Sequence, residues 1–408
     1  MGAVTDLSKS AWAINQIGGT LKKIVTAVLA GTLSVSAGLV GLGAATATAA
    51  SKPIVIGAIA GTTGAYGSTG VAVINGTIMA VAKINASGGV LGRQLKLVWG
   101  NDNASATTSA LDFKKFAGEG AVAMLGSPDT ATTTVTLADQ TKLPDLGAID
   151  DGGPAIYPSG PKGAPAAWAW SNSLNTYAWG QAVGNYANKS CPSGLAVLHD
   201  PTFYGLGGLA GIEQTYTKKL AVDDAISEDW SSGSTTSLDS EISKIKTSGA
   251  TCVDVWLTPQ DQAVFVNEMH SLGDKFTVLG NDETSADSTF AGLAKANANG
   301  MISAELTASY SPNATVKSFA SAYLKKFHVA TTPFAELSYD AVFMLAKAIT
   351  AGKSTSPKSI QTQLNKVTNY VGLTGSLTFT KQIHVTINAP QLTTVEYSTA
   401  SSKWLPVK

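Results

Sequence analysis

Apolar and polar positions follow a strand–helix–strand pattern that begins at Ile54. Residues 54–59 form a short run rich in β-branched side chains, which is typical of a strand buried on both faces of a sheet. After a glycine-rich loop, apolar residues recur at helical spacing, at Val71, Ile74, Ile78 and Val81. Gly88 and Gly89 end this helix, and a second strand follows up to Asp102. The pattern predicts one βαβ unit of a parallel sheet.

The alternation continues and then restarts further along the chain. Residues 122–125 and 146–149 predict two more strands, with a helix that reaches towards Lys142 between them. A second series begins with a strand over residues 195–199 and a helix up to Leu220. Its further elements are strands over residues 225–230, 253–257 and 276–279 and a helix over residues 235–249. The two series predict two similar α/β units, and such sheets bind ligands beyond the carboxyl ends of their strands.

The pattern changes after Gly300. Residues 316–327 and 336–351 have helical patterns, whereas residues 375–404 alternate as strands do, most clearly over residues 392–397. This periodicity does not indicate to which of the two units the C-terminal part returns.

The first 49 residues have the features of a secretory signal peptide. Lys22 and Lys23 precede an apolar run over residues 24–42, and small residues before Ala50 offer cleavage sites. The alternative is a transmembrane anchor, since the run is nearly long enough to span a bilayer. The run is rich in small side chains and no basic cluster follows it, which favours residues 1–49 as a signal peptide. No cysteine lies near the cleavage region, so we expect no lipoprotein anchor.

Composition narrows the classes of function. The formal net charge is +0 and 14% of the residues are charged, so nothing suggests a nucleic-acid or membrane-surface partner. The chain that follows the signal peptide is long enough for two domains. We expect a secreted monomer that uses no cofactor.

The two cysteines, Cys191 and Cys252, each lie just before a predicted strand. If those strands are parallel neighbours, both sulfur atoms lie at the same edge of the sheet, within bridging distance. Export to an oxidising compartment favours a disulfide, and the alternative is two buried free thiols. The chain has no C-x-x-C motif, so redox catalysis and a structural zinc site are poorly supported.

The sequence lacks the motifs of common enzyme classes. It has no G-x-S-x-G nucleophile elbow and no G-x-x-x-x-G-K-[ST] phosphate loop. The four histidines, His199, His270, His328 and His384, do not have the spacing of metal ligands. The pair His199-Asp200 ends a predicted strand, and strand-end packing with Asp200 as a helix cap explains it better than catalysis does. We therefore expect no enzyme activity and no metal site.

One segment carries a family resemblance. Residues 84–102, INASGGVLGRQLKLVWGND, resemble the start of extracellular solute-binding proteins of the branched-chain amino-acid type. These leucine-binding-like proteins, with the periplasmic binding protein type 1 fold, are the receptor subunits of ABC importers. The resemblance covers essentially all of the chain after the signal peptide. It implies an α/β clamshell of two lobes, each a mostly parallel sheet flanked by helices, joined by a three-segment hinge.

The resemblance also implies where the chain passes between the lobes. The implied crossovers lie near residues 171–172, 305–307 and 378–380. Lobe 1 would comprise residues 51–171 and 307–378, and lobe 2 would comprise residues 172–306 and 379–408.

In lobe 1, the resemblance implies a ligand site in the loops that follow the strands. Residues 126–134, GSPDTATTT, resemble the family's loop that holds the ligand carboxylate, with Thr130 as its hydroxyl residue. The alternative role of Thr130 is that of a helix N-cap, which is compatible with anion binding. Tyr66 matches the first-lobe aromatic residue of the family, and the alternative is a surface tyrosine.

The next loop departs from the family pattern. Relatives usually have Ser or Ala, then Ala and Thr, before a proline, whereas this chain has Asp150, Asp151 and Gly152. Two acidic side chains would repel a ligand carboxylate unless they turn away or bind a cationic group. We expect Asp151 and Gly152 to line the cleft. The departure argues against a plain branched-chain amino acid and favours a ligand of positive or amide character.

In lobe 2, two further residues match ligand positions of the family. Tyr204 matches the second-lobe aromatic residue, and Asp282 lies where relatives place the acid that holds the α-ammonium group. Glu283 takes that role if the alignment shifts by one residue. The alternatives are a surface tyrosine and a solvated acid. Residues 258–260, Thr-Pro-Gln, replace a tyrosine that relatives often have.

The function implied by the resemblance is capture of a small amino-acid-like or amide solute by hinge closure. The protein would work in the periplasm or outside the cell envelope and deliver the solute to the permease of an ABC importer. One alternative is a ligand-sensing module for a signalling receptor. A remote alternative is a hydrolase that uses the clustered acids Asp150, Asp151 and Asp282.

Overall fold

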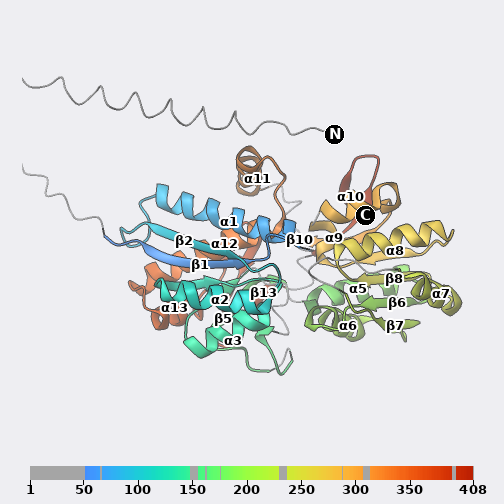
Figure 1. The fold of residues 1–408 in the computed structure, drawn as a ribbon, viewed down its shortest axis with the longest axis horizontal. Coiled ribbons are helices and arrows are strands. Elements are labelled where there is room, and N and C mark those ends of the chain that lie inside the picture. Colours follow the sequence, from blue (N-terminus) through green and yellow to red (C-terminus); the bar gives the residue numbers. More distant parts are fainter. Residues whose placement is uncertain are drawn as a thin grey trace, which may run out of the picture. The chain divides into compact units, whose positions relative to one another are not determined.

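The computed structural model describes residues 51–64, 67–147, 155–160, 163–174, 176–228, 237–286, 288–306, 313–387 and 392–407 (Figure 1). These residues belong to one unit, Ala50–Lys408. The predicted signal peptide lies outside the described residues, as do Tyr66, Asp150, Asp151 and Gly152. Asp282 begins a helix, but its side chain is also outside the description.

The first lobe is built on a six-stranded sheet with the strand order β13-β5-β4-β3-β1-β2. Its strands are β1 (Ile54–Ala60), β2 (Leu95–Asn101), β3 (Ala121–Leu125), β4 (Asp145–Gly147), β5 (Ala169–Leu174) and β13 (Val385–Ile387). All neighbouring strands run parallel, as the alternating pattern predicts. β1 is buried along almost its whole length, which explains its continuous apolar sequence.

Helices cover both faces of this first sheet. They are α1 (Gly67–Ala86), α2 (Ala106–Gly118), α3 (Ala131–Thr141), α11 (Ala314–Phe327), α12 (Pro333–Gly352) and α13 (Pro357–Leu364). Ile56 of β1 belongs to the core cluster that contains residues of α1 and α12, whereas Ile59 packs in the cluster of Phe113 from α2. Because successive side chains of a strand point to opposite faces, these helices lie on opposite sides of the sheet.

The helices α1 and α12 pack side by side. A side chain at Gly76 of α1 would collide with the backbone carbonyl of Ala335, so the glycine permits this close approach. Of the described helices, only α1 is long and apolar enough to cross a membrane. Of its most apolar stretch, 56% is buried within the protein, as in the core helix of a folded lobe.

The second lobe is built on a seven-stranded sheet with the order β15-β14-β10-β9-β8-β6-β7. Its strands are β6 (Leu195–His199), β7 (Val222–Ala225), β8 (Cys252–Trp256), β9 (Thr277–Gly280), β10 (Ile302–Leu306), β14 (Leu392–Ser398) and β15 (Lys403–Pro406). The first five run parallel to one another, whereas β14 and β15 are antiparallel additions at one edge. Both sheets are therefore mostly parallel, as predicted.

Helices also flank the second sheet. They are α5 (Thr176–Ser190), α6 (Phe203–Thr215), α7 (Asp239–Ser248), α8 (Pro259–Ser271), α9 (Asp282–Ala286), α10 (Ser288–Ala294) and the 3₁₀ helix η1 (Lys295–Ala298). A two-stranded sheet of β11 (Tyr370–Gly372) and β12 (Gly375–Leu377) completes the described elements.

Strand pairing shows where the chain passes between the two sheets. β5 belongs to the first sheet through Leu174, so the first crossover lies slightly after residues 171–172. β10 ends at Leu306 in the second sheet, so the second crossover follows this residue. β13 pairs with β5, so the third crossover follows Ile387 and the prediction of residues 378–380 was wrong. Three residues are too few to give a recognisable periodicity, which is why the sequence did not indicate β13.

Two other predictions about elements were wrong in detail, and one strand was not predicted. β7 ends at Ala225, where the predicted strand begins. The helix α6 ends at Thr215 rather than at Leu220. β10 was not predicted from its own residues, because Ser303 and Glu305 interrupt the apolar run that indicates a buried strand.

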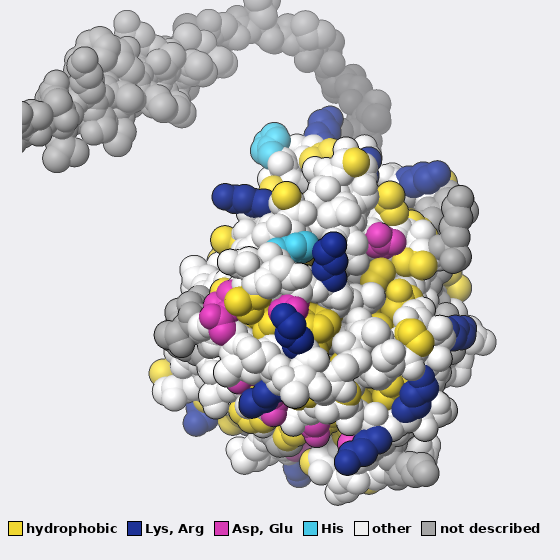
Figure 2. All heavy atoms as spheres, turned by 90° about the vertical axis from the view of Figure 1, so that its right-hand side faces the viewer, with side chains coloured by type: hydrophobic (Ala, Val, Ile, Leu, Met, Phe, Trp, Pro, Cys, Tyr) yellow, Lys and Arg dark blue, Asp and Glu magenta, His cyan; other side chains and the backbone are white. Residues whose placement is uncertain are grey.

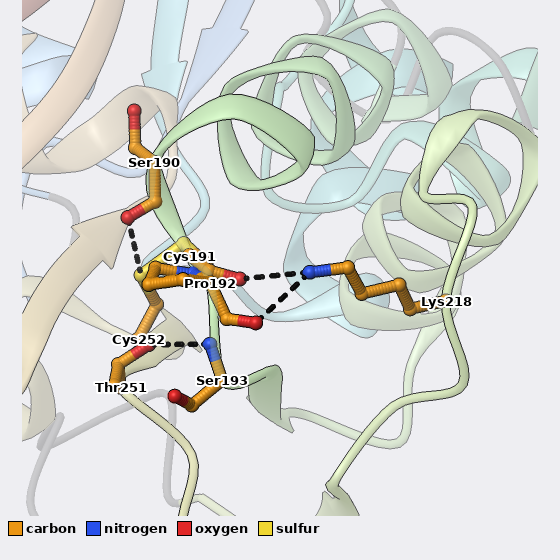
Figure 3. The surroundings of a disulfide bond; sticks show 7 residues. All are labelled: Ser190, Cys191, Pro192, Ser193, Lys218, Thr251 and Cys252. Carbon is orange, nitrogen blue, oxygen red and sulfur yellow. Dashed lines mark hydrogen bonds between the residues drawn. A yellow bond between two sulfur atoms is a disulfide. The ribbon is translucent and has the colours of Figure 1, made fainter.

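The predicted disulfide between Cys191 and Cys252 is present in the structure (Figure 3). Both cysteines are fully buried, and Leu195 of β6 pairs with Cys252 of β8, so the two strands are parallel neighbours. On the solvent side, the ammonium group of Lys218 donates hydrogen bonds to the carbonyl oxygens of Cys191 (3.4 Å) and Pro192 (3.0 Å). The bridge fixes the amino end of β8 to the segment that leads into β6.

Candidate functional site

A cavity of about 1030 Å³ lies between elements of the two lobes. From the first lobe it is lined by the start of α1, by α11 and by residues 329–333, which lead into α12. From the second lobe it is lined by Ser285 of α9, by Glu305 near the end of β10, and by Tyr397 and Trp404 of β14 and β15. Its volume is at the upper end of the range of roughly 300–1,000 Å³ that is usual for small-molecule sites.

A hydrogen bond joins the two lobes beside this cavity. The hydroxyl group of Thr69, in the first turn of α1, donates to Oε2 of Glu283 on α9 over 2.6 Å. Both side chains are buried. The contact therefore connects the loop region after β1 with the region after β9, at the carboxyl ends of both strands, where parallel sheets bind ligands. The sequence analysis considered Asp282 and Glu283 as the acid that contacts the ligand. The structure describes the side chain of Glu283, which faces the first lobe.

Two glutamates line the cavity, one from each lobe. Glu305 comes from β10 and Glu336 from the first turn of α12. The side chain of Glu336 is 2% exposed, and its Oε2 atom has no hydrogen-bond partner among the described residues. Burial raises the pKa of Glu336 to about 8, with further contributions from the negative charges of Asp340 and Glu305. The sequence analysis missed both glutamates, because they lie 31 positions apart and on different lobes.

Thr130 lies at the N-cap position of α3, but its hydroxyl group does not cap the helix. The hydroxyl oxygen lies 2.9 Å from Oδ2 of Asp102 and 2.8 Å from Oγ of Ser109. All three side chains are buried. The hydroxyl group thus belongs to a polar network between the end of β2 and the helices α2 and α3, and Thr130 does not line the cavity.

Tyr204 lies in the first turn of α6 and is buried, with 4% of its surface exposed. Its ring packs edge-on against Trp256, with 5.7 Å between the ring centroids. The interpretation as a surface tyrosine is therefore wrong. Tyr204 also does not line the described cavity, so its predicted contact with a ligand stays a prediction.

The pair His199-Asp200 is explained by packing at the end of β6. The Nε2 atom of His199 lies 3.3 Å from Oδ1 of Asp223 on β7, and Nδ1 lies 2.7 Å from the carbonyl oxygen of Asp200. The N-cap of α6 is Thr202, not Asp200. Asp200 instead accepts a hydrogen bond from the backbone amide of Thr202 (2.7 Å) and shapes the turn before the helix.

The structure also shows acids at the strand ends of the second lobe that the sequence analysis missed. Glu228 follows β7 and accepts a hydrogen bond from the backbone amide of Thr258 over 2.7 Å. Burial raises its pKa to about 9, with contributions from a hydrogen bond to Asp261 and from the charges of Asp261 and Asp200. The sequence pattern placed Glu228 within a predicted strand over residues 225–230, whereas in the structure Glu228 lies in the loop after β7.

Charged side chains of both signs are scattered over the outer face of the second lobe (Figure 2). Lysine side chains lie there among Asp, Glu and apolar side chains. Within the described residues, no group of three or more His, Cys, Asp or Glu side chains has the arrangement of a metal site. Among the described residues, the strongest candidate for a functional site is therefore the cavity between the lobes with its buried carboxyl groups.

Comparison with known proteins places this geometry in context. The model of the periplasmic binding protein family matches residues 53–401. No curated protein matches the sequence. Among solved structures, a periplasmic binding protein type 1 from Bordetella pertussis superposes with a TM-score of 0.79 at 20% identity, covering 87% of this chain and 100% of that chain.

Two further structures carry bound molecules. The branched-chain amino acid transporter substrate-binding protein LivJ from Streptococcus pneumoniae, in complex with isoleucine, has a TM-score of 0.73 at 18% identity and covers 87% of this chain and 100% of its own. A solute-binding protein of an ABC transporter from Rhodopseudomonas palustris, in complex with 3,4-dihydroxybenzoic acid, has a TM-score of 0.71 at 16% identity, with 87% and 96% covered. At these identities the likeness shows the fold, two mostly parallel α/β lobes. The matched family and these structures are binding proteins rather than enzymes.

Proposed function

Since the chain belongs to the periplasmic binding protein family, we propose that it captures a small solute between its two lobes and presents it to the permease of an ABC importer. The observation that carries this proposal is the cavity lined by both lobes, next to the hydrogen bond between Thr69 and Glu283. A ligand in such a cavity contacts both lobes at once, so it stabilises the closed arrangement relative to the open one.

The three crossovers between the sheets supply a hinge. They follow Leu174, Leu306 and Ile387, and each is a short connection between a strand of one sheet and an element of the other lobe. Few connecting residues need to change their backbone angles for the lobes to rotate, and hinge closure of this kind is the general mechanism of periplasmic binding proteins.

The proposed solute is amino-acid-like or an amide. Thr130 and Tyr204 do not line the cavity in this structure, so their contacts with the solute, like those of the other family-loop residues, are proposed for the ligand-bound protein. The proposed contacts are those of the family loops. They are Tyr66, Thr130, Asp151 and Gly152 of the first lobe and Tyr204 and Asp282 of the second. Thr130 would act through its helix N-terminus or after its hydroxyl group leaves the network with Asp102, because that group is already engaged.

The proposed location is outside the cytoplasm, with residues 1–49 removed as a signal peptide and without a lipid anchor. The second candidate function is a sensory module that passes the ligand state to a signalling receptor. The bilobal fold suits both functions, and an adjacent permease gene or an adjacent sensor gene distinguishes them.

A thermal-shift screen of the mature protein against amino acids, amides, amines and aromatic acids tests solute binding. A ligand present at about 100 times its Kd should raise the free energy of unfolding by roughly 2.7 kcal/mol. A solute that raises the melting temperature in proportion to the logarithm of its concentration supports the proposal. A complete absence of stabilisation across all four classes would contradict it.

A further inference from the structure

The cavity between the lobes has a chemical bias that the family fold does not require. Its apolar walls come from α1, α11 and β15, at Val71, Val316, Tyr323 and Trp404. Its charged lining residues are two glutamates, Glu305 and Glu336, and one lysine, Lys317. The cavity therefore combines a large apolar surface with acidic groups that lie away from bulk water.

We propose that this cavity binds an organic cation, a primary amine on an apolar or aromatic body, whose ammonium group is held by Glu336 and Glu305. This inference rests on the proposed function and names the class of solute. The two carboxyl groups come from different lobes, so an ammonium group between them would also hold the lobes together.

One oxygen atom of the buried Glu336 carboxyl group has no hydrogen-bond partner among the described residues. The side chain of Glu336 is 2% exposed, and the atom without a partner is Oε2. A buried polar group without a partner is costly, and a carboxylate more so than a neutral group. The hydroxyl oxygen of Thr332, another residue that lines the cavity, is likewise buried without a described partner. An amine carries up to three N–H donors and satisfies both acceptors.

The groups around Glu336 do not neutralise its charge. On its own helix, Asp340 adds negative charge and already accepts hydrogen bonds from the backbone amides of Leu373 (2.9 Å) and Thr374 (3.0 Å). Glu305 on β10 also adds negative charge. Lys317 of α11 lines the same cavity, but the ion pairs of the described residues include none between Lys317 and Glu336.

Matched pairs of small molecules test the inference. Phenethylamine and isoamylamine are compared with 2-phenylethanol and isoamyl alcohol, which keep the apolar body and replace the ammonium group by a hydroxyl group. In isothermal titration calorimetry of the mature protein, the Kd of each amine should be lower than that of its alcohol by a factor of about 10 or more, because only the amine forms a charge-assisted hydrogen bond with a carboxylate.

Variants identify the groups responsible. Glu336→Gln keeps the shape and removes the charge, and it should weaken amine binding by about 10-fold or more while leaving the alcohols unchanged. Glu305→Gln should have the same sign of effect. Glu396→Gln, an exposed residue of β14, is the matched control and should change neither.

Proton release is a readout that a purely structural role would not give. The raised pKa of Glu336 keeps its carboxyl group protonated near pH 7 in the empty cavity, whereas a bound ammonium group favours the carboxylate. Binding should therefore release roughly one proton at pH 7, measured as a difference in heat between phosphate and Tris buffers, and Glu336→Gln should abolish the release.

Three results would overturn the inference: alcohols that bind as tightly as their amines, a Glu336→Gln variant with unchanged amine affinity, or no binding of either amine at millimolar concentration. In each case, a neutral or anionic solute found in the thermal-shift screen would leave the proposed function standing. Failure of the whole screen would instead contradict the proposed function.

Discussion

Removal of the disulfide between Cys191 and Cys252 should lower the free energy of unfolding by about 4 kcal/mol. The two cysteines are separated by 61 positions. In the chain-entropy model, a closed loop of that length removes roughly 14 cal/mol/K of entropy from the unfolded chain, which is about 4 kcal/mol at 25 °C. The bridge joins the amino end of β8 to the segment that leads into its neighbour β6, so its loss should loosen the second lobe first.

The assay is urea denaturation, monitored by far-UV circular dichroism, of three samples. They are the oxidised protein, the same protein reduced under native conditions, and the double variant Cys191→Ala with Cys252→Ala. Reduction removes the cross-link and keeps the sulfur atoms, whereas the variant also removes buried volume, so the variant should be the less stable of the two. Free energies of unfolding of the oxidised and reduced proteins that agree within about 1 kcal/mol would refute the reasoning.

Three other perturbations follow from single contacts. Asp254 is fully buried, and burial raises its pKa well above 3.8. The folded state therefore binds an extra proton, and the free energy of unfolding falls as the pH rises from about 4 towards the pKa of the folded state. The variant Asp254→Asn should not show this decrease when the free energies of unfolding near pH 4 and near pH 8 are compared. Gly208→Ala should destabilise the second lobe by about 1–3 kcal/mol in thermal denaturation, because the added methyl group would collide with the ring of Trp256. Thr69→Val should weaken binding of any solute that closes the lobes, because the variant removes the hydroxyl group of the first lobe that donates a hydrogen bond to the buried Glu283. Calorimetry measures the affinity. An unchanged affinity would show that this contact does not stabilise closure.

The parts of the fold that could be predicted are those in which one physical pattern dominates the local sequence. β1, β6 and β8 are buried on both faces, so they appear as uninterrupted apolar runs. The disulfide could be predicted because each cysteine precedes such a run, which places both sulfur atoms at one edge of a parallel sheet. β10 and β13 could not, because Glu305 interrupts the first and the second has only three residues.

The site was harder to predict than the fold, because its residues lie far apart in the sequence and come close only where the two lobes face each other. Glu336 begins a helix of one lobe and Glu305 lies on a strand of the other, and no local pattern links them. The hydroxyl group of Thr130 is in the loop where the resemblance places it, but Asp102 at the end of β2 competes for it. A match to a family position thus indicates the loop in which a residue lies, whereas the hydrogen-bond partners of its side chain depend on the fold of the whole chain.

Ligand-dependent closure of the two lobes is the central claim, and small-angle X-ray scattering tests it most directly. The mature protein is measured alone and with a saturating concentration of the solute that stabilises it most in the thermal-shift screen. The account predicts that the radius of gyration decreases on binding and that the decrease follows the binding isotherm measured by calorimetry. A solute that binds with full occupancy and leaves the radius of gyration unchanged would contradict it.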